Sequence, residues 1–204
     1  SKELPGDYIL KDVNGDGVVN DLDKTPLFWS GSPLIHYGFN VEASWKNFDF
    51  YALFQGSALY TVQFDEVYAK MLCFKGGNTP EYFYDRWHLS DPYDANSEWI
   101  PGEWPAIRLE QDMGSFYTRD SQIWRKNASY LRLKTIEIGY TFSPRLMHKL
   151  GIGSLRIYAN GNNLFTVCDP FVKAFDPEKI EGDYSAGLNY PLNKSFNFGL
   201  TLNF

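Results

Sequence analysis

An oxygen-rich stretch near the start of the chain has the residue types and spacing of a calcium-binding loop. From Asp12 to Asp23 it reads Asp-Val-Asn-Gly-Asp-Gly-Val-Val-Asn-Asp-Leu-Asp, with oxygen ligands at positions 1, 3, 5, 9 and 12 and glycine at position 6. Ca²⁺ binds about six to eight oxygen atoms, and the glycine permits the tight turn on which they converge. The predicted metal ligands are Asp12, Asn14, Asp16, the Val18 carbonyl, Asn20 and Asp23.

The end of this loop predicts a weak structural site. Its last ligand is Asp23 instead of the usual bidentate glutamate, so we expect a dissociation constant of roughly 10⁻⁴ to 10⁻³ M, as in extracellular modules. No amphipathic helices flank the loop, which favours a calcium staple over a helix-pair sensor. The alternative is an Asp/Asn/Gly-rich turn that holds no ion.

The elements that must position this loop are strands, because apolar and polar residues alternate with a period of two. The alternation predicts strands over residues 35–45, 48–56, 130–142, 154–166 and 195–204. The first two are separated by a tight turn, so they form a hairpin, and Trp45 and Phe48 flank that turn. In the third strand the apolar phase changes between Leu133 and Ile136, which predicts a β-bulge near Thr135.

Strand length and loop length together favour a membrane β-barrel. The last ten residues would rise about 25 Å when tilted, the height of the apolar band of an outer-membrane barrel. Long and short connections alternate along the chain, which places the long loops on one side of an antiparallel sheet. Five strands cannot close a barrel, so we expect this all-β chain to be part of a larger one. A half-buried strand of a soluble sandwich alternates in the same way.

The composition is that of a folded protein with an excess of aromatic residues. The chain is 44% hydrophobic and 18% aromatic, with a formal net charge of -6. The negative charge and the lack of a basic stripe argue against nucleic-acid binding. The first residues show no signal-peptide pattern, so a signal would have to lie elsewhere.

A segment of about seventy residues between Ala58 and Ala128 lacks a sustained period. Such a loop is unusual in a compact soluble domain and ordinary in an outer-membrane barrel. Its rings and carboxylates could bind sugars or a partner protein, or could simply pack the loop upon itself. These residues are Tyr82, Tyr84, Trp87, Trp99, Trp104 and Trp124, beside Asp85, Asp91, Asp94, Glu98 and Glu103.

Nothing in the sequence predicts an enzyme. It contains no G-x-S-x-G, no H-E-x-x-H and no phosphate-binding loop, and His36, His88 and His148 are isolated. Cys73 and Cys168 both lie in expected loops, where they either form a disulfide or remain free thiols.

These motifs together resemble the C-terminal portion of the barrel of SusC/RagA-family TonB-dependent transporters of Bacteroidetes outer membranes. The resemblance covers nearly the whole chain and rests on residues 5–7, 11–18, 37–40, 47–49, 54–56, 128–134, 137–140, 154–158, 162–166, 175–178 and the terminal aromatic strand. The family's usual Trp-Thr-Pro stretch is replaced here by Trp87-His88-Leu89 and an insertion over residues 99–105.

The resemblance implies a fold, a location and a set of partners. Residues 1–33 would be an extracellular loop with the calcium-type motif, and residues 34–204 would be the last five or so strands of a 22-stranded barrel with their extracellular loops. The rest of the barrel would enclose a plug domain that TonB engages. A SusD-like surface lipoprotein would help to import oligosaccharides or peptides across the outer membrane. The alternative is a soluble, calcium-stapled carbohydrate-binding β domain or adhesion module.

Overall fold

The computed structural model describes residues 4–26, 28–64, 81–107, 122–178 and 190–204. The chain divides into two compact units, one formed by Ser1–Phe28 with Gln63–Arg125 and the other by Trp29–Val62 with Lys126–Phe204. The expected division at residue 33, by role in a barrel, stays a prediction. Among the described residues, no helix is both long enough and apolar enough to cross a membrane.

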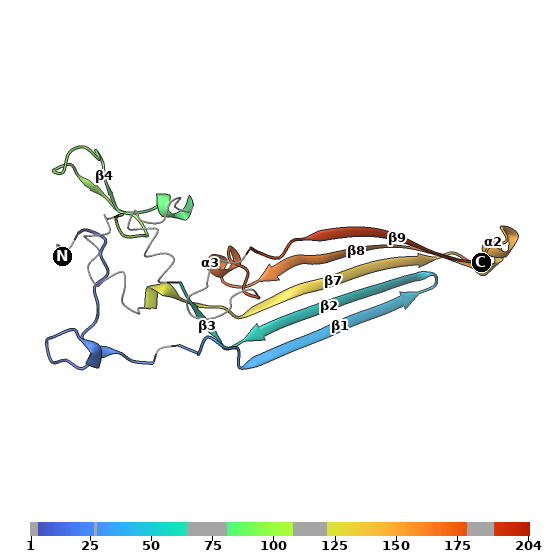
Figure 1. The fold of residues 1–204 in the computed structure, drawn as a ribbon, viewed down its shortest axis with the longest axis horizontal. Helices are drawn as coiled ribbons and strands as arrows, with labels where there is room; N and C mark the ends of the chain where they lie inside the picture. The colour runs from blue at the N-terminus through green and yellow to red at the C-terminus, as the bar shows by residue number, and fades with distance from the viewer. Residues whose placement is uncertain (1–3, 27, 65–80, 108–121, 179–189) are drawn as a thin grey trace. The chain divides into compact units, whose positions relative to one another are not determined.

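The second unit contains one antiparallel sheet of five long strands (Figure 1). They are β1 (Ile35–Trp45), β2 (Phe48–Ala58), β7 (Tyr130–Thr141), β8 (Ser154–Val167) and β9 (Ser195–Asn203), in the order β1-β2-β7-β8-β9. All five predicted strands are confirmed, and each pairs with the next long strand along the chain.

The connections between these strands alternate in length, as expected. A two-residue turn at Lys46 and Asn47 joins β1 to β2, and Lys46 adopts the left-handed conformation with φ 55°. At the same end of the sheet, β7 and β8 are joined through the short helix α2 (Pro144–Lys149). The long connections β2–β7 and β8–β9 therefore leave from the other end, here called the loop end.

The change of phase in the third strand is a β-bulge, as predicted. Leu53 and Phe54 of β2 pair with Thr135 and Leu133, so Lys134 is an additional residue in β7. Across β7 and β8 the register shifts between the same two residues, and Asn163 of β8 adopts φ 54°. The bulge returns Leu133 and Ile136 to one face of the sheet.

The remaining described elements are short. They comprise the 3-10 helices Asp21–Asp23, Glu81–Tyr84 and Gln122–Trp124, the pair β4 (His88–Leu89) and β5 (Trp99–Ile100), the pair β3 (Thr61–Gln63) and β6 (Arg125–Asn127), and the helix α3 (Pro170–Lys173). The first unit has an aromatic core in which Phe83 and Trp104 meet edge to face and Trp104 stacks on Trp124.

Candidate functional site

The calcium-type loop is folded around its own carboxylates. Asp12 accepts hydrogen bonds from the backbone N–H groups of Gly15 and Gly17, at 2.6 and 2.8 Å. Asn14 and Asp16 accept from the N–H groups two residues further on. Gly15 and Gly17 both have positive φ, 79° and 82°, a conformation that glycine adopts without strain, and the Asn14 amide donates to the Asp16 carboxylate at 3.1 Å.

Asp23 closes the loop from its far end. One carboxylate oxygen accepts from the N–H of Val13 at 2.8 Å and the other from the N–H of Asn20 at 2.8 Å. Asn20 in turn accepts from the N–H of Leu22, which completes a capping box. The backbone N–H groups of Asn20 and Val13 lower the pKa of Asp23, with smaller contributions from the Asn14 N–H and the Asp12 side chain. The first and last predicted ligands therefore lie close together.

The donor set of this loop fits a hard cation in its chemistry. All six predicted ligands offer oxygen, and a carboxylate oxygen that accepts one N–H bond keeps a second lone pair. In the described part of the chain, no group of three or more His, Cys, Asp or Glu side chains forms a ready-made metal cage. The structure thus brings Asp12, Asn14, Asp16, Asn20 and Asp23 to one loop, and calcium binding there stays a prediction.

The five-stranded sheet has one apolar and one polar face. In register across the strands, Val41, Ala52, Ile136 and Gly161 share the apolar face, and so do Ala43, Phe50, Ile138 and Ala159. Within the described residues much of this face is exposed, with Ile138 54% and Phe198 85% exposed, whereas Ala52 and Leu133 are buried. Large apolar side chains exposed on several neighbouring strands indicate that this face meets a membrane or another protein surface.

The polar face carries an ion-pair cluster near the short turns. The guanidinium of Arg156 in β8 contacts the carboxylate of Asp49 in β2 and that of Glu137 in β7, the latter at 2.8 Å. Gly139 lies between Asp49 and Tyr158 in the register, and a Cβ there would collide with the Asp49 carboxylate and the Arg156 guanidinium. This glycine lets the pair reach across the intervening strand.

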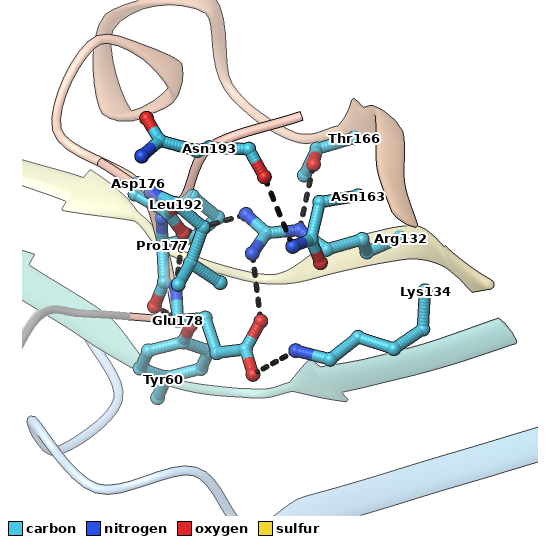
Figure 2. A network of polar contacts seen from close by, with 10 residues as sticks. All are labelled: Tyr60, Arg132, Lys134, Asn163, Thr166, Asp176, Pro177, Glu178, Leu192 and Asn193. Atoms are coloured by element: carbon cyan, nitrogen blue, oxygen red, sulfur yellow. Dashed lines mark hydrogen bonds and ion pairs between the residues drawn. The ribbon is translucent and has the colours of Figure 1, made fainter. Parts of the chain in front are cut away.

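A second ionic network occupies the loop end of the same face (Figure 2). Arg132 of β7 donates from Nη2 to Asp176 at 2.6 Å, from Nη1 to Glu178 at 2.7 Å and from Nε to Thr166 at 2.8 Å. Lys134 donates to the other oxygen of Glu178 at 2.7 Å. The side chains of Arg132 and Asp176 are both only 4% exposed.

Asp176 holds the two limbs of the β8–β9 connection together. Its second carboxylate oxygen accepts from the N–H of Leu192 at 2.7 Å. Burial opposes ionisation of this carboxyl, yet the hydrogen bonds from Arg132, Leu192 and Glu178 lower its pKa overall. Tyr60 donates its hydroxyl to the Pro177 carbonyl at 3.0 Å, and burial raises the pKa of Tyr60, so this hydroxyl remains a donor.

The aromatic residues of the long loop divide into two groups. Trp104 and Trp124 are buried with Phe83, which confirms self-packing of the loop for these two. Trp87 and Trp99 are half-buried and Tyr84 is exposed, as are Asp85, Asp91, Asp94, Glu98 and Glu103. The side chain of Tyr82 lies outside the described residues. Two pockets among the described residues, one beside Tyr37 and Cys168 and one beside Trp45 and Phe48, are lined by none of these predicted rings and carboxylates.

Neither the Arg132 network nor the burial of Phe83 is predicted by the sequence pattern. Asp176, Pro177 and Glu178 were noted only as part of a family motif, and their contact with Arg132 spans 44 residues. A buried charge pair leaves little trace in a strand pattern, although an Asp-Pro-Glu run after a strand is a signal for an anchored turn. Cys168 is a free thiol whose pKa is raised by burial, and Cys73 lies outside the described residues.

Comparison with known proteins gives relatives of one kind. No protein-family model matches the sequence. The chain is 27% identical over 208 residues to TonB-dependent receptor P3 of Formosa agariphila, a match that covers 98% of this chain and 19% of the receptor. It is 28% identical over 214 residues to TonB-dependent receptor P26 of the same organism, covering 99% of this chain and 20% of that receptor. The chain thus spans about a fifth of the length of these curated relatives.

The fold is also similar to that of solved structures. The RagAB peptide importer in its open-open state aligns with 97% of this chain and 20% of its own, at a TM-score of 0.63 and 25% identity. The closed-closed state aligns with 92% of this chain and 19% of its own, at a TM-score of 0.65 and 26% identity.

Proposed function

Because the sequence and the fold of this chain are those of a fragment of a SusC/RagA-like TonB-dependent transporter, we propose that it forms neighbouring strands and exterior loops of an outer-membrane transport barrel. The chain contributes wall and loops to this transporter, and its role is geometric instead of catalytic. The two-faced sheet carries this proposal, since the uncovered apolar face suits lipid and the polar face suits a water-filled lumen.

Strand dimensions support this placement. The five strands contain 11, 11, 12, 14 and 9 residues, and strands of about ten residues tilted by about 45° span the apolar part of a bilayer. Trp45 and Phe48 are exposed beside the β1–β2 turn on the apolar face. Aromatic rings in this position form the girdle at a membrane interface.

The complete transporter works with partners outside this chain. A plug fills the barrel and connects it to TonB, and a SusD-like surface lipoprotein delivers oligosaccharides or oligopeptides. Support for a lipoprotein and for peptides comes from the similarity to the RagAB peptide importer. Support for glycans comes from the exposed rings and carboxylates of the long loop, since flat rings stack on sugars.

We also propose that the loop over residues 12–23 holds a structural Ca²⁺ on the exterior side. Its oxygen-only donor set and the approach of Asp12 to Asp23 support this site. A bound ion would fasten the loop and leave the barrel strands unchanged.

Whether the apolar face of the sheet contacts lipid can be tested in the full-length receptor reconstituted in phospholipid vesicles. A fluorescent thiol label is placed at Phe198→Cys, on the apolar face of β9, or at Asn197→Cys, its neighbour on the polar face. We expect brominated lipids to quench the label at residue 198 and to spare the label at residue 197. Equal quenching at both positions would contradict the membrane assignment.

A further inference from the structure

The loop-end network fixes a piece of the β8–β9 connection on one particular face of the sheet. We call this piece, residues 176–178 and 192–193, the ledge. Arg132 pairs in register with Gln55 and with Thr166, and these residues belong to the polar face. All side chains that hold the ledge from β7 and β8 thus lie on the polar side (Figure 2).

The two irregularities in the strands serve this attachment. The bulge adds Lys134 to β7, and its ammonium reaches the Glu178 carboxylate at 2.7 Å. In β8, Asn163 has a left-handed φ of 54° and donates its amide N–H to the Asn193 carbonyl at 3.2 Å. A bulge commonly redirects a side chain toward a functional surface, and here both irregular positions bind the ledge.

The contacts describe a rigid attachment. Two cations, Arg132 and Lys134, balance two anions, Asp176 and Glu178, and the Arg132–Asp176 pair is buried. A buried pair that also receives backbone N–H bonds resists separation, because opening it leaves a charge without a partner. Tyr60, which follows β2 in the chain, also holds the ledge, because its hydroxyl donates to the Pro177 carbonyl.

We propose that the ledge is a fixed inward shelf that narrows the exterior mouth of the transport lumen and lines the path of the substrate. This inference rests on the proposed function, since only a barrel makes the polar face a lumen. Arg132 is the positioning residue, and the exposed Asn193 is the part of the ledge that a passing solute meets.

The experiment measures access to the ledge in cells that express the full-length receptor. In a background with Cys73→Ser and Cys168→Ser, a cysteine is introduced at Asn193→Cys or, as an exposed loop control, at Tyr93→Cys. Each variant is treated with a small maleimide dye and with a maleimide on a long polyethylene glycol chain. Because confinement costs the polymer conformational entropy, we expect polymer labelling at residue 193 to be slowed by roughly tenfold or more relative to the dye.

Two further variants test the role of the network. Arg132→Met should release the ledge and raise polymer labelling at residue 193 toward the dye rate. Arg156→Met breaks the other ion-pair cluster of the same face without touching the ledge, so it should leave labelling unchanged. Heat-modifiable migration of each variant in gel electrophoresis confirms that the barrel has folded.

The outcomes separate this inference from the proposed function. If the polymer labels residue 193 less than tenfold more slowly than the dye does, the ledge does not point inward. If the polymer labelling rate is unchanged in Arg132→Met, the network does not hold the ledge. The lipid-quenching experiment on residues 197 and 198 does not depend on the ledge. A membrane barrel whose β8–β9 connection pointed outward would therefore show selective quenching at residue 198 and would still label rapidly with the polymer at residue 193.

Discussion

Carboxylates that bind backbone N–H groups organise two of the irregular segments that the structure describes. Asp12 and Asp23 fold the calcium-type loop, and Asp176 joins the two limbs of the β8–β9 connection. An ionised carboxylate accepts several hydrogen bonds at once, so one side chain can replace the ladder that a strand would supply. These two segments differ in burial, since Asp23 is half-buried while Asp176 is enclosed with Arg132.

Calcium binding is tested by substitutions within and beside the loop. In the full-length receptor we expect Ca²⁺ titration calorimetry to give a dissociation constant of roughly 10⁻⁴ to 10⁻³ M. Asp23→Asn removes a charged ligand and should weaken binding by about tenfold or more. Asp21→Asn is the matched control, because Asp21 lies in the same loop and pairs with Lys24 outside the ligand set. If the two variants weakened Ca²⁺ binding equally, the assignment of Asp23 as a calcium ligand would be wrong.

The lowered pKa of Asp176 predicts that acid loosens the ledge. A carboxyl whose pKa is lower in the folded state contributes stability that is present above its unfolded pKa of about 4 and is lost as the pH falls through the folded value. Polymer labelling at Asn193→Cys, with a pyridyl disulfide reagent that reacts in acid, should therefore rise below about pH 4. Asp176→Asn should abolish this pH response, and a response that survives the substitution would assign it to another group.

Strand pairing explains how a sheet without a second layer keeps a defined register. Each long strand matches its neighbour along nearly its whole length, and the shifts occur only around Lys134 and Asn163. On the apolar face Phe39 stacks on Phe54 with ring centroids 4.8 Å apart, and on the polar face Arg156 links three strands. Both faces thus oppose a one-residue slip, which would exchange their chemistry.

The proposed orientation of β9, with its apolar side toward lipid, predicts that a charged substitution lowers stability on that side alone. Leu200 pairs with Ile157 on the apolar face, whereas Thr201 pairs with Arg156 on the polar face. In vesicles, Leu200→Arg should lower the free energy of unfolding by about 2–4 kcal/mol, because the charge enters lipid. Thr201→Arg should change it far less in the same urea titration. Equal losses would mean that β9 does not face lipid on this side.

The described sheet is open, with β1 and β9 at its edges and one face of apolar side chains in solvent. Unpaired strand edges and large apolar patches both promote association. A barrel resolves both, since the flanking strands pair with further strands and lipid covers the apolar face. The match to about a fifth of each relative agrees with a role as one sector of such an assembly.

This openness predicts the behaviour of the 204-residue chain expressed alone. We expect it to elute as aggregate in detergent-free buffer and to become dispersed in a mild detergent, measured by size exclusion with light scattering. The full-length receptor in the same detergent is the control. A monodisperse monomer in plain buffer would favour the soluble carbohydrate-binding alternative.

Local sequence patterns were sufficient for the strands, the turn at Lys46 and the bulge beside Thr135, because a period of two and a change of phase are properties of neighbouring residues. They were also sufficient to separate an apolar from a polar face of the sheet, whereas the calcium site over residues 12–23 stays a prediction. The sequence pattern could not show on which face of the sheet a long connection lies, because the few residues that attach the connection do not recur at a regular spacing. Arg132 and Asp176 are 44 residues apart, and Arg156 and Asp49 are 107 apart.

The folded chain alone showed that the connection after β8 turns onto the polar face and that Phe83, Trp104 and Trp124 pack the long loop upon itself. Pairing of distant charges depends on which strands are adjacent, on where a bulge redirects a side chain and on how much water is excluded. These features exist only in the assembled sheet, whereas the alternation that forms each strand is present in the residues of that strand.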